Sequence, residues 1–137
     1  MAGLLHDFNR EYDEPTPGPE VLAGRVRLLL AEGDAVLIIG PGPDGLVVLR
    51  FRPAIWSEAL ECYLAELYVV PHRRGSGLGR ALMEAAIALA RREGADHMDL
   101  GTSEDDVAAR SLYESMGFIN REGRPDGPLS YYYERAL

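Results

Sequence analysis

The sequence predicts a protein of the α/β class, folded as one domain over residues 1–137. Segments with apolar residues at helical spacing alternate with short β-branched segments, in the order two helices, three strands, a helix, a strand, a helix and two strands. A chain of 137 residues with 47% apolar residues can bury one substantial core. The third strand runs directly into a glycine-rich loop and the next helix, which indicates a binding site.

Two amphipathic helices are predicted before the first strand. The first covers Leu4 to Tyr12, and the second covers Pro19 to Glu32, after a proline-rich loop. The stripe that the second helix turns toward the core is Val21, Leu22, Val26, Leu29 and Leu30.

Three strands are expected next. Ala35 to Ile39 and Leu46 to Arg52 flank a Gly/Pro-rich turn and form a hairpin, and Leu60 to Val70 is a longer strand. The remaining predicted elements, in chain order, are a helix at Leu78–Glu93, a strand at His97–Gly101, a helix from Ser103 or Asp105 to Met116, and strands at Phe118–Asn120 and Leu129–Arg135. Along the last strand Tyr131, Tyr132 and Tyr133 alternate, so at least one should point inward.

The glycine loop suits a pyrophosphate. Residues 69–80 read VVPHRRGSGLGR, without the Gly-Lys-Ser/Thr end of a Walker loop. A dinucleotide fingerprint counted from Gly75 would need a third glycine where Arg80 stands. The pattern that fits is Arg-x-x-Gly-x-Gly, as Arg74, Gly77 and Gly79. Glycines let the main chain approach a ligand closely, and a helix start offers unpaired N–H groups and a positive dipole end.

A second motif follows after one intervening strand. Residues 109–118 read ARSLYESMGF and resemble the pattern Asn-x-x-Ala-x-x-Leu-Tyr-x-x-x-Gly-Phe, with Asp106 where the pattern often has Asn. Both motifs, their order and their separation resemble those of the GNAT superfamily, the acetyl-CoA-dependent N-acetyltransferases. The resemblance runs from about Val36 to the C-terminus.

The resemblance implies a GNAT fold, with helices flanking a mixed, mostly antiparallel sheet whose central strands splay apart. GNAT domains usually begin with one further strand before the first helix, and the sequence shows no such strand. A truncated chain, a different true start or an edge borrowed from a partner would each account for this, and a homodimer is one expectation.

The resemblance also implies that acetyl-CoA is the co-substrate. The strand just before the loop would offer its edge to the pantetheine amides, through Leu67, Tyr68, Val69 and Val70. The loop would hold the pyrophosphate, through Arg74, Gly75, Ser76, Gly77, Leu78, Gly79 and Arg80. Asp106 and Ala109 of the second motif complete the expected cofactor-binding set.

Tyr113 is the expected general acid, because it stands at the position of the family's acid in the second motif. The thiolate that leaves coenzyme A takes up a proton near pKa 8.5, and a nearby phenol can supply it. The alternative is a core aromatic residue, since Leu112, Met116 and Phe118 are apolar neighbours.

Glu66 is the expected general base, needed because a lysine-like amine with a pKa near 10.4 is mostly protonated at neutral pH. Strict alternation puts its carboxylate on one apolar face, where burial would raise its pKa; the other residues of that face are Leu60, Cys62, Leu64, Tyr68 and Val70. Three alternatives are open. They are an ion pair of Glu66 with Arg50 or Arg52, Glu61 as the base, and a water relay without a single base.

The acceptor is expected to be a small amine. A net charge of −8 disfavours nucleic acid as a partner and would attract a cation, such as an aminoglycoside or a polyamine. A protein N-terminus or lysine is the second candidate, and a non-catalytic acyl-CoA-binding module is the rival. The resemblance places the acceptor site at the acidic segment His6 to Pro17 and at Pro53 to Glu58, where Trp56 is a pocket wall or a half-buried anchor.

The composition adds general expectations. The lone Cys62 should be a core residue and fits a reducing cytoplasm. No apolar run is long enough to span a membrane, and no signal peptide is recognised. His6, His72 and His97 are scattered, so no metal site is expected.

Overall fold

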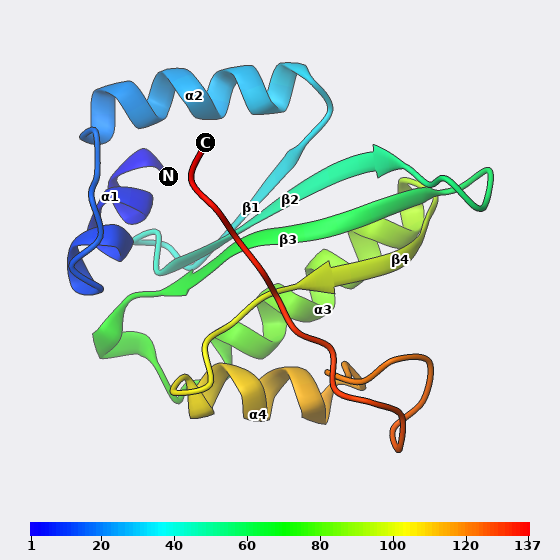
Figure 1. Cartoon of the computed structure of the whole chain (residues 1–137). Coiled ribbons are helices and arrows are strands. Elements are labelled where there is room, and N and C mark those ends of the chain that lie inside the picture. Colours follow the sequence, from blue (N-terminus) through cyan, green and yellow to red (C-terminus); the bar gives the residue numbers. More distant parts are fainter. The chain divides into compact units, whose positions relative to one another are not determined.

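The computed structural model describes all residues, Met1–Leu137, as two compact units, Met1–Leu100 and Gly101–Leu137. The first unit holds all the strands, and the second holds a single helix; a domain over the whole chain stays a prediction. The elements of the first unit are α1 (Ala2–Glu11), α2 (Pro19–Ala31), β1 (Ala35–Ile39), β2 (Gly45–Pro53), β3 (Leu60–Val69), the short 3-10 helix η1 (Pro71–Arg73), α3 (Leu78–Arg92) and β4 (Ala95–Leu100) (Figure 1). The helix of the second unit is α4 (Val107–Ser115).

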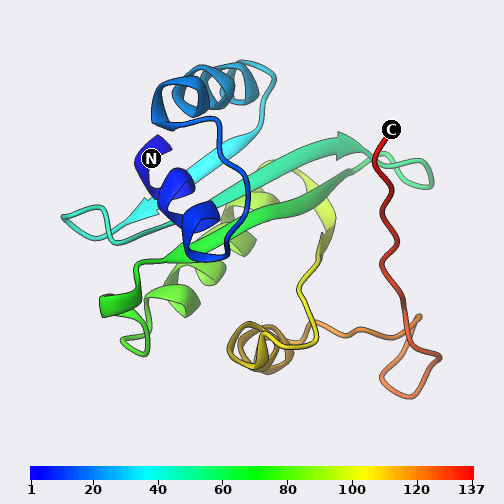
Figure 2. The same cartoon turned by 60° about the vertical axis from the view of Figure 1, so that its left-hand side comes forward.

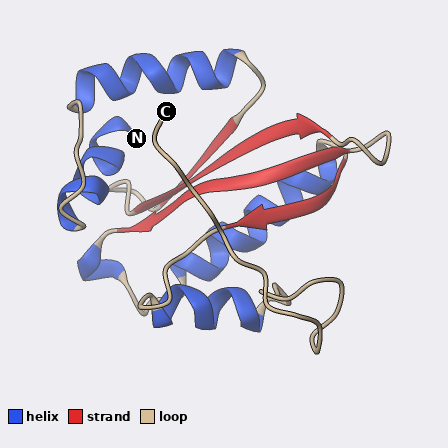
Figure 3. Cartoon of the chain, in the orientation of Figure 1, coloured by secondary structure: helices blue, strands red, loops and turns tan.

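The four strands form one mixed sheet in the order β1-β2-β3-β4 (Figure 3). β1, β2 and β3 pair antiparallel, and β4 pairs parallel to β3. The predicted α/β class and the mostly antiparallel sheet are therefore confirmed. Parallel neighbours need a long crossover, and α3 supplies it between β3 and β4.

The helices of the first unit cover both faces of the sheet. α1 and α2 lie over one face, and α3 lies along the other (Figure 2). On the α1 face the buried cluster is Leu4, Leu46, Val48 and Tyr68. Among the fully buried side chains of the unit are Val47, Leu49, Cys62, Leu82 and Met83. The buried position of Cys62 confirms that it is a core residue.

A β-bulge interrupts the pairing of β3 with β2. Val48 pairs with Glu66, but the next residue, Leu49, pairs with Leu64, so Ala65 is an extra residue in β3. Paired residues of antiparallel strands share a face. Glu66 therefore faces α1 with Val48, and Leu64 faces the opposite side with Leu49.

The bulge corrects the prediction that Glu66 shares a face with Cys62 and Leu64. Strict alternation assumes a regular strand, and one inserted residue exchanges the two faces from that point onward. Of the residues expected beside Glu66, Tyr68 lies on its face, where it pairs with Leu46, and Val70 packs against the same cluster.

β3 also parts from β4 at the bulge. Parallel pairing between them ends at Leu64 and Leu100, so residues 65–69 of β3 have no strand partner on that side. This is the predicted splay of the central strands. The other edge of this stretch remains paired with β2.

The second unit differs from the prediction in two respects. The cap of α4 is Asp106, whose side chain accepts a hydrogen bond from the Ala109 N–H at 2.9 Å, and not Ser103 or Asp105. The two predicted C-terminal strands are wrong, because the only pairing there is an isolated bridge between Arg121 and Leu129.

The missing strands lack an apolar face to bury. Tyr131, Tyr132 and Tyr133 are 72%, 74% and 86% exposed, so the expectation that one points inward is wrong as well. A two-stranded hairpin without a buried face is marginal at best, whatever the β-propensity of its residues. In the first unit Trp56 is 94% exposed, so it is neither a pocket wall nor a half-buried anchor. No helix of the chain is long and apolar enough to cross a membrane.

Replacing two glycines of the first unit by alanine should change its stability in opposite directions. An alanine Cβ at Gly45 would lie 2.7 Å from the Tyr68 main-chain oxygen, so Gly45→Ala should destabilise the fold by roughly 1–3 kcal/mol. Gly24 lies inside α2 with nothing within 4 Å of the added Cβ, so Gly24→Ala should stabilise by about 0.5–1 kcal/mol. Urea unfolding of both variants checks the opposite signs.

Candidate functional site

The segment from β3 to α3 turns twice through glycine. η1 follows β3 at once, with the Arg73 N–H donating to the Val70 oxygen at 2.9 Å. Gly75 and Gly77 then adopt left-handed φ angles of 72° and 88°, which residues with a Cβ rarely adopt. Gly77 is the N-cap of α3, and it accepts the first helical hydrogen bond from the Ala81 N–H at 3.0 Å.

This loop has the properties of an anion site. α3 has no side-chain N-cap, and the first-turn N–H groups of any helix lack partners within the helix. A Cβ built on Gly75 or Gly77 meets nothing within 4 Å, so the main chain is open on that side. Open main-chain N–H groups at the positive end of a helix suit a phosphate or a pyrophosphate. The residues present therefore fit the diphosphate of coenzyme A.

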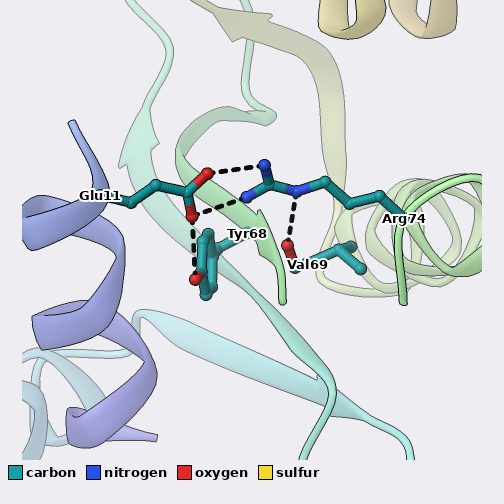
Figure 4. A network of polar contacts seen from close by, with 4 residues as sticks. All are labelled: Glu11, Tyr68, Val69 and Arg74. Atoms are coloured by element: carbon teal, nitrogen blue, oxygen red, sulfur yellow. Dashed lines mark hydrogen bonds and ion pairs between the residues drawn. The ribbon is translucent and has the colours of Figure 1, made fainter. Parts of the chain in front are cut away.

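The arginine of the loop motif contacts three groups within the first unit (Figure 4). Arg74 makes a bidentate ion pair with the Glu11 carboxylate, at 2.6 and 2.8 Å. Its Nε donates to the Val69 oxygen at 2.9 Å, and its guanidinium carbon lies 5.6 Å from the centre of the Tyr68 ring. The Tyr68 hydroxyl donates to Glu11 at 3.1 Å, which closes the network. Arg74 therefore fastens α1 to the end of β3.

The pKa values of Glu11 and Arg74 favour the charged form of both side chains. The hydrogen bond from Arg74 lowers the pKa of Glu11, and the same bond raises the pKa of Arg74. Burial raises the pKa of Tyr68, so the phenol keeps its proton. The side chains of Arg74 and Glu11 are 42% and 28% exposed, and such pairs contribute roughly 0.2–1 kcal/mol. The contact is thus ordered but modest in strength.

The unpaired edge of β3 leads directly into the loop. The Val70 N–H donates to the Asp44 oxygen, and the Tyr68 oxygen lies against Gly45, so the main-chain groups of Tyr68 and Val70 point toward β2 and its turn. Main-chain direction alternates along a strand, so Leu67 and Val69 turn their N–H and C=O groups to the open edge. Of the four residues predicted to contact pantetheine, these two have edge groups that can pair with an amide.

The predicted base lies on the α1 face of β3. Glu66 is half-buried without a hydrogen bond or an ion pair, and burial raises the pKa of its carboxyl. The alternative of an ion pair with an arginine of β2 is excluded by the partners of those arginines. Arg50 pairs with Asp34 at 3.0 Å, and Arg52 pairs with Glu61 at 2.7 Å.

The remaining predicted residues lie on α4, in the second unit. Tyr113 is 7% exposed, its ring is 6.1 Å from that of Phe118, and burial raises its pKa to about 12. Asp106 and Ala109 are bonded to each other in the helix cap. The structure thus gathers Glu66, the β3 edge and the loop in one unit, and holds Tyr113 protonated in the other.

A splayed strand edge that continues into a loop with open N–H groups at a helix start can accommodate a ligand with an amide-containing arm and a diphosphate. The chain belongs to the GNAT family of acetyltransferases, because the model of that family matches residues 5–118. Members of this family use acetyl-CoA as their co-substrate. No group of three or more His, Cys, Asp or Glu residues is placed to hold a metal ion.

Known proteins resemble the chain in sequence and in fold. A solved structure from Arthrobacter sp. FB24, provisionally described as an acetyltransferase, is 44% identical with a TM-score of 0.87, over 98% of this chain and 87% of that one. The mycothiol acetyltransferase of Thermobispora bispora is 45% identical over 65 residues, which are 45% of this chain and 22% of the relative. The streptothricin acetyltransferase of Streptomyces lavendulae is 36% identical over 89 residues, 64% of this chain and 46% of the relative. The chain thus spans less than half the length of these two relatives.

Sequence reasoning found the loop but missed the partner of its arginine. Glu11 lies 63 positions before Arg74, so no local motif connects them. The only signal in the sequence is that Glu11 belongs to an acidic segment predicted to face the acceptor.

Two glycines with the same left-handed geometry test the loop. Gly77→Ala and Gly94→Ala place a Cβ at φ angles of 88° and 90° with open space around it, so each should cost about 1–2 kcal/mol of stability. Only Gly77 lies in the loop, so only its variant should weaken coenzyme A binding, by about tenfold in calorimetry. Equal affinities of the two variants for coenzyme A would contradict the assignment of the loop.

Proposed function

We propose that the chain transfers the acetyl group of acetyl-CoA to a primary amine, preferably a small cationic one such as an aminoglycoside or a polyamine. The observation that carries this proposal is the continuity of the open β3 edge with the loop at the start of α3. One strand, loop and helix then offer an amide-pairing edge and a diphosphate site in sequence, which is the order of groups along acetyl-CoA.

The donor is held through main-chain groups. The edge groups of Leu67 and Val69 other than the Val69 oxygen pair with the amide-containing arm, and the N–H groups of the loop and of the first turn of α3 receive the diphosphate. Arg74 and Arg80 are the cations of this segment. An arginine in the first turn of a helix is mildly unfavourable there unless an anion is close, so Arg80 suits a phosphate contact.

The transfer needs a base, an oxyanion donor and an acid. Glu66 takes a proton from the ammonium so that the neutral nitrogen attacks the thioester carbonyl and forms the new C–N bond. An edge N–H of Leu67 or Val69 stabilises the oxyanion. The C–S bond then breaks, Tyr113 gives its proton to the departing thiolate, and the excess proton on the amide nitrogen passes through water to the Tyr113 phenolate. The buried carboxylate is a stronger base than an exposed one, because burial raises its pKa.

The charge of the chain supports a cationic acceptor. The net charge is −8, and the face that carries Glu66 is covered by α1, whose segment is acidic. Two relatives are named mycothiol acetyltransferase and streptothricin acetyltransferase, and one from Saccharomyces cerevisiae is named N-alpha-acetyltransferase 30. A protein N-terminus or lysine is therefore the second candidate acceptor.

A non-catalytic acyl-CoA-binding module is the candidate from another class. It would keep the loop and the strand edge without using a base or an acid. The unpaired Glu66 carboxylate argues against a non-catalytic module. A half-buried acid without a partner lowers the stability of the fold, and a catalytic role would account for its presence.

Release of the coenzyme A thiol across a panel of amines tests the proposal. Acetyl-CoA supplied with aminoglycosides, polyamines and N-terminal peptides should yield thiol with at least one small cationic amine. Binding of coenzyme A in calorimetry with no thiol release from any amine would favour the non-catalytic module.

The acidic limb of the pH–rate profile should report Glu66. Glu66 can accept a proton only as a carboxylate, so activity should fall when the pH is lowered through its pKa. Because burial raises this pKa, the fall should begin above 4.5, the ordinary pKa of a glutamate carboxyl. Glu66→Gln should remove this limb and lower kcat about a hundredfold. Measuring Glu61→Gln beside it decides between the two carboxylates, and a larger loss there would reassign the base.

Tyr113→Phe should lower kcat about tenfold or more and leave the Kd for coenzyme A almost unchanged. With a pKa of about 12 the phenol stays protonated up to pH 10, so it should cause no alkaline loss of activity below that pH. Unchanged kcat in the variant would remove Tyr113 from the mechanism.

A further inference from the structure

The contacts of Arg74 are those of a bound cation. A carboxylate, an aromatic ring and a main-chain oxygen surround its guanidinium, contributed by Glu11, Tyr68 and Val69. These three groups are the usual partners of ammonium and guanidinium ions in proteins. The chain thus contains a built cation site, and one of its own side chains fills it.

The cation site is on the side of the sheet where an acceptor has to arrive. Glu66 and Tyr68 share the α1 face of β3, and Glu11 is the last residue of α1. The Val69 oxygen belongs to the open edge. A cationic group held by these partners would therefore lie on the same face as the carboxylate proposed to deprotonate the amine.

The guanidinium of Arg74 has a second candidate partner, the diphosphate of coenzyme A. Arg74 directly precedes Gly75, the first left-handed residue of the anion loop, and its side chain is 42% exposed. Rotation of a half-exposed side chain changes its partner without moving β3 or α1. A diphosphate brings more negative charge than one carboxylate, and arginine binds phosphate oxygens in the same bidentate way.

We propose that Glu11, the Tyr68 ring and the Val69 oxygen form the binding site for the cationic group of the acceptor, and that Arg74 occupies this site until coenzyme A draws its guanidinium to the loop. This inference rests on the proposed acetyl transfer. It makes Arg74 a positioning residue that couples the two substrates. Donor binding empties the acceptor site, so each substrate strengthens the binding of the other, by the same factor.

Coenzyme A titrations of the Glu11→Gln variant test the competition. Because Glu11 holds Arg74 away from the loop, Glu11→Gln should bind coenzyme A about fivefold more tightly than the unmodified protein. Glu84→Gln is the matched control, since Glu84 is an exposed carboxylate of α3 without an ion pair, and its Kd should not change. In an Arg74→Gln background the Glu11→Gln gain should disappear.

Methylguanidinium, a small mimic of the arginine head, tests the cation site directly. It should bind Arg74→Ala and perturb the Tyr68 ring signals in NMR, and it should fail to bind the Glu11→Gln/Arg74→Ala double variant. In the unmodified protein it should bind only when coenzyme A is present. Melting curves identify any variant that does not fold, and the Glu11→Gln titration does not need the Arg74→Ala protein.

The outcomes separate this inference from the proposed function. An unchanged or weaker coenzyme A affinity of Glu11→Gln, or a gain that persists without Arg74, would overturn the exchange of partners while leaving acetyl transfer in place. Failure of the unmodified protein to bind coenzyme A would overturn the proposed function instead. Methylguanidinium binding that is independent of Glu11 would overturn the cation site itself.

Discussion

The site depends on one extra residue in β3. At Ala65 the strand shifts its register against β2, and at the same place it parts from β4. The shift turns Glu66 and Tyr68 to the α1 face, and the parting frees the edge at Leu67 and Val69. A regular strand would put Glu66 on the opposite face, and full pairing with β4 would close the edge. The irregularity thus puts one carboxylate on the apolar α1 face, and the open edge of the sheet begins at the same place.

The network around Arg74 extends this arrangement beyond the sheet. Glu11 ends α1 and the Val69 oxygen ends β3, and a single guanidinium joins them. Because both side chains are partly exposed, the link orders the helix against the strand without making the connection permanent. The helix proposed to face the acceptor and the loop proposed to bind the donor are therefore joined by one contact of modest strength.

Local patterns predicted much of the fold and the glycine loop before α3. Every strand and helix predicted for the first unit is confirmed within a few residues, because apolar spacing and the Gly/Pro turns are local signals. The bulge at Ala65 was not predictable, since no residue type marks it and the expected alternation of faces assumes a regular strand. The ion pair between Glu11 and Arg74 could not be predicted from a local pattern, because the two residues are 63 positions apart in the sequence. The tyrosine run after Leu129 has strand propensity, but no apolar face is buried there, and so the strands do not form.

The burial of Cys62 decides how the reaction can be followed. Its side chain is inaccessible to solvent. Burial is the main cause that raises the pKa of the thiol to about 11, and the negative charges of Asp99 and Asp34 add to this effect. The reactive thiolate form is therefore scarce near neutral pH, and no other cysteine exists in the chain. A chromogenic disulfide reagent added to the folded protein will register only sulfhydryl liberated from the acyl donor, with no background from the polypeptide.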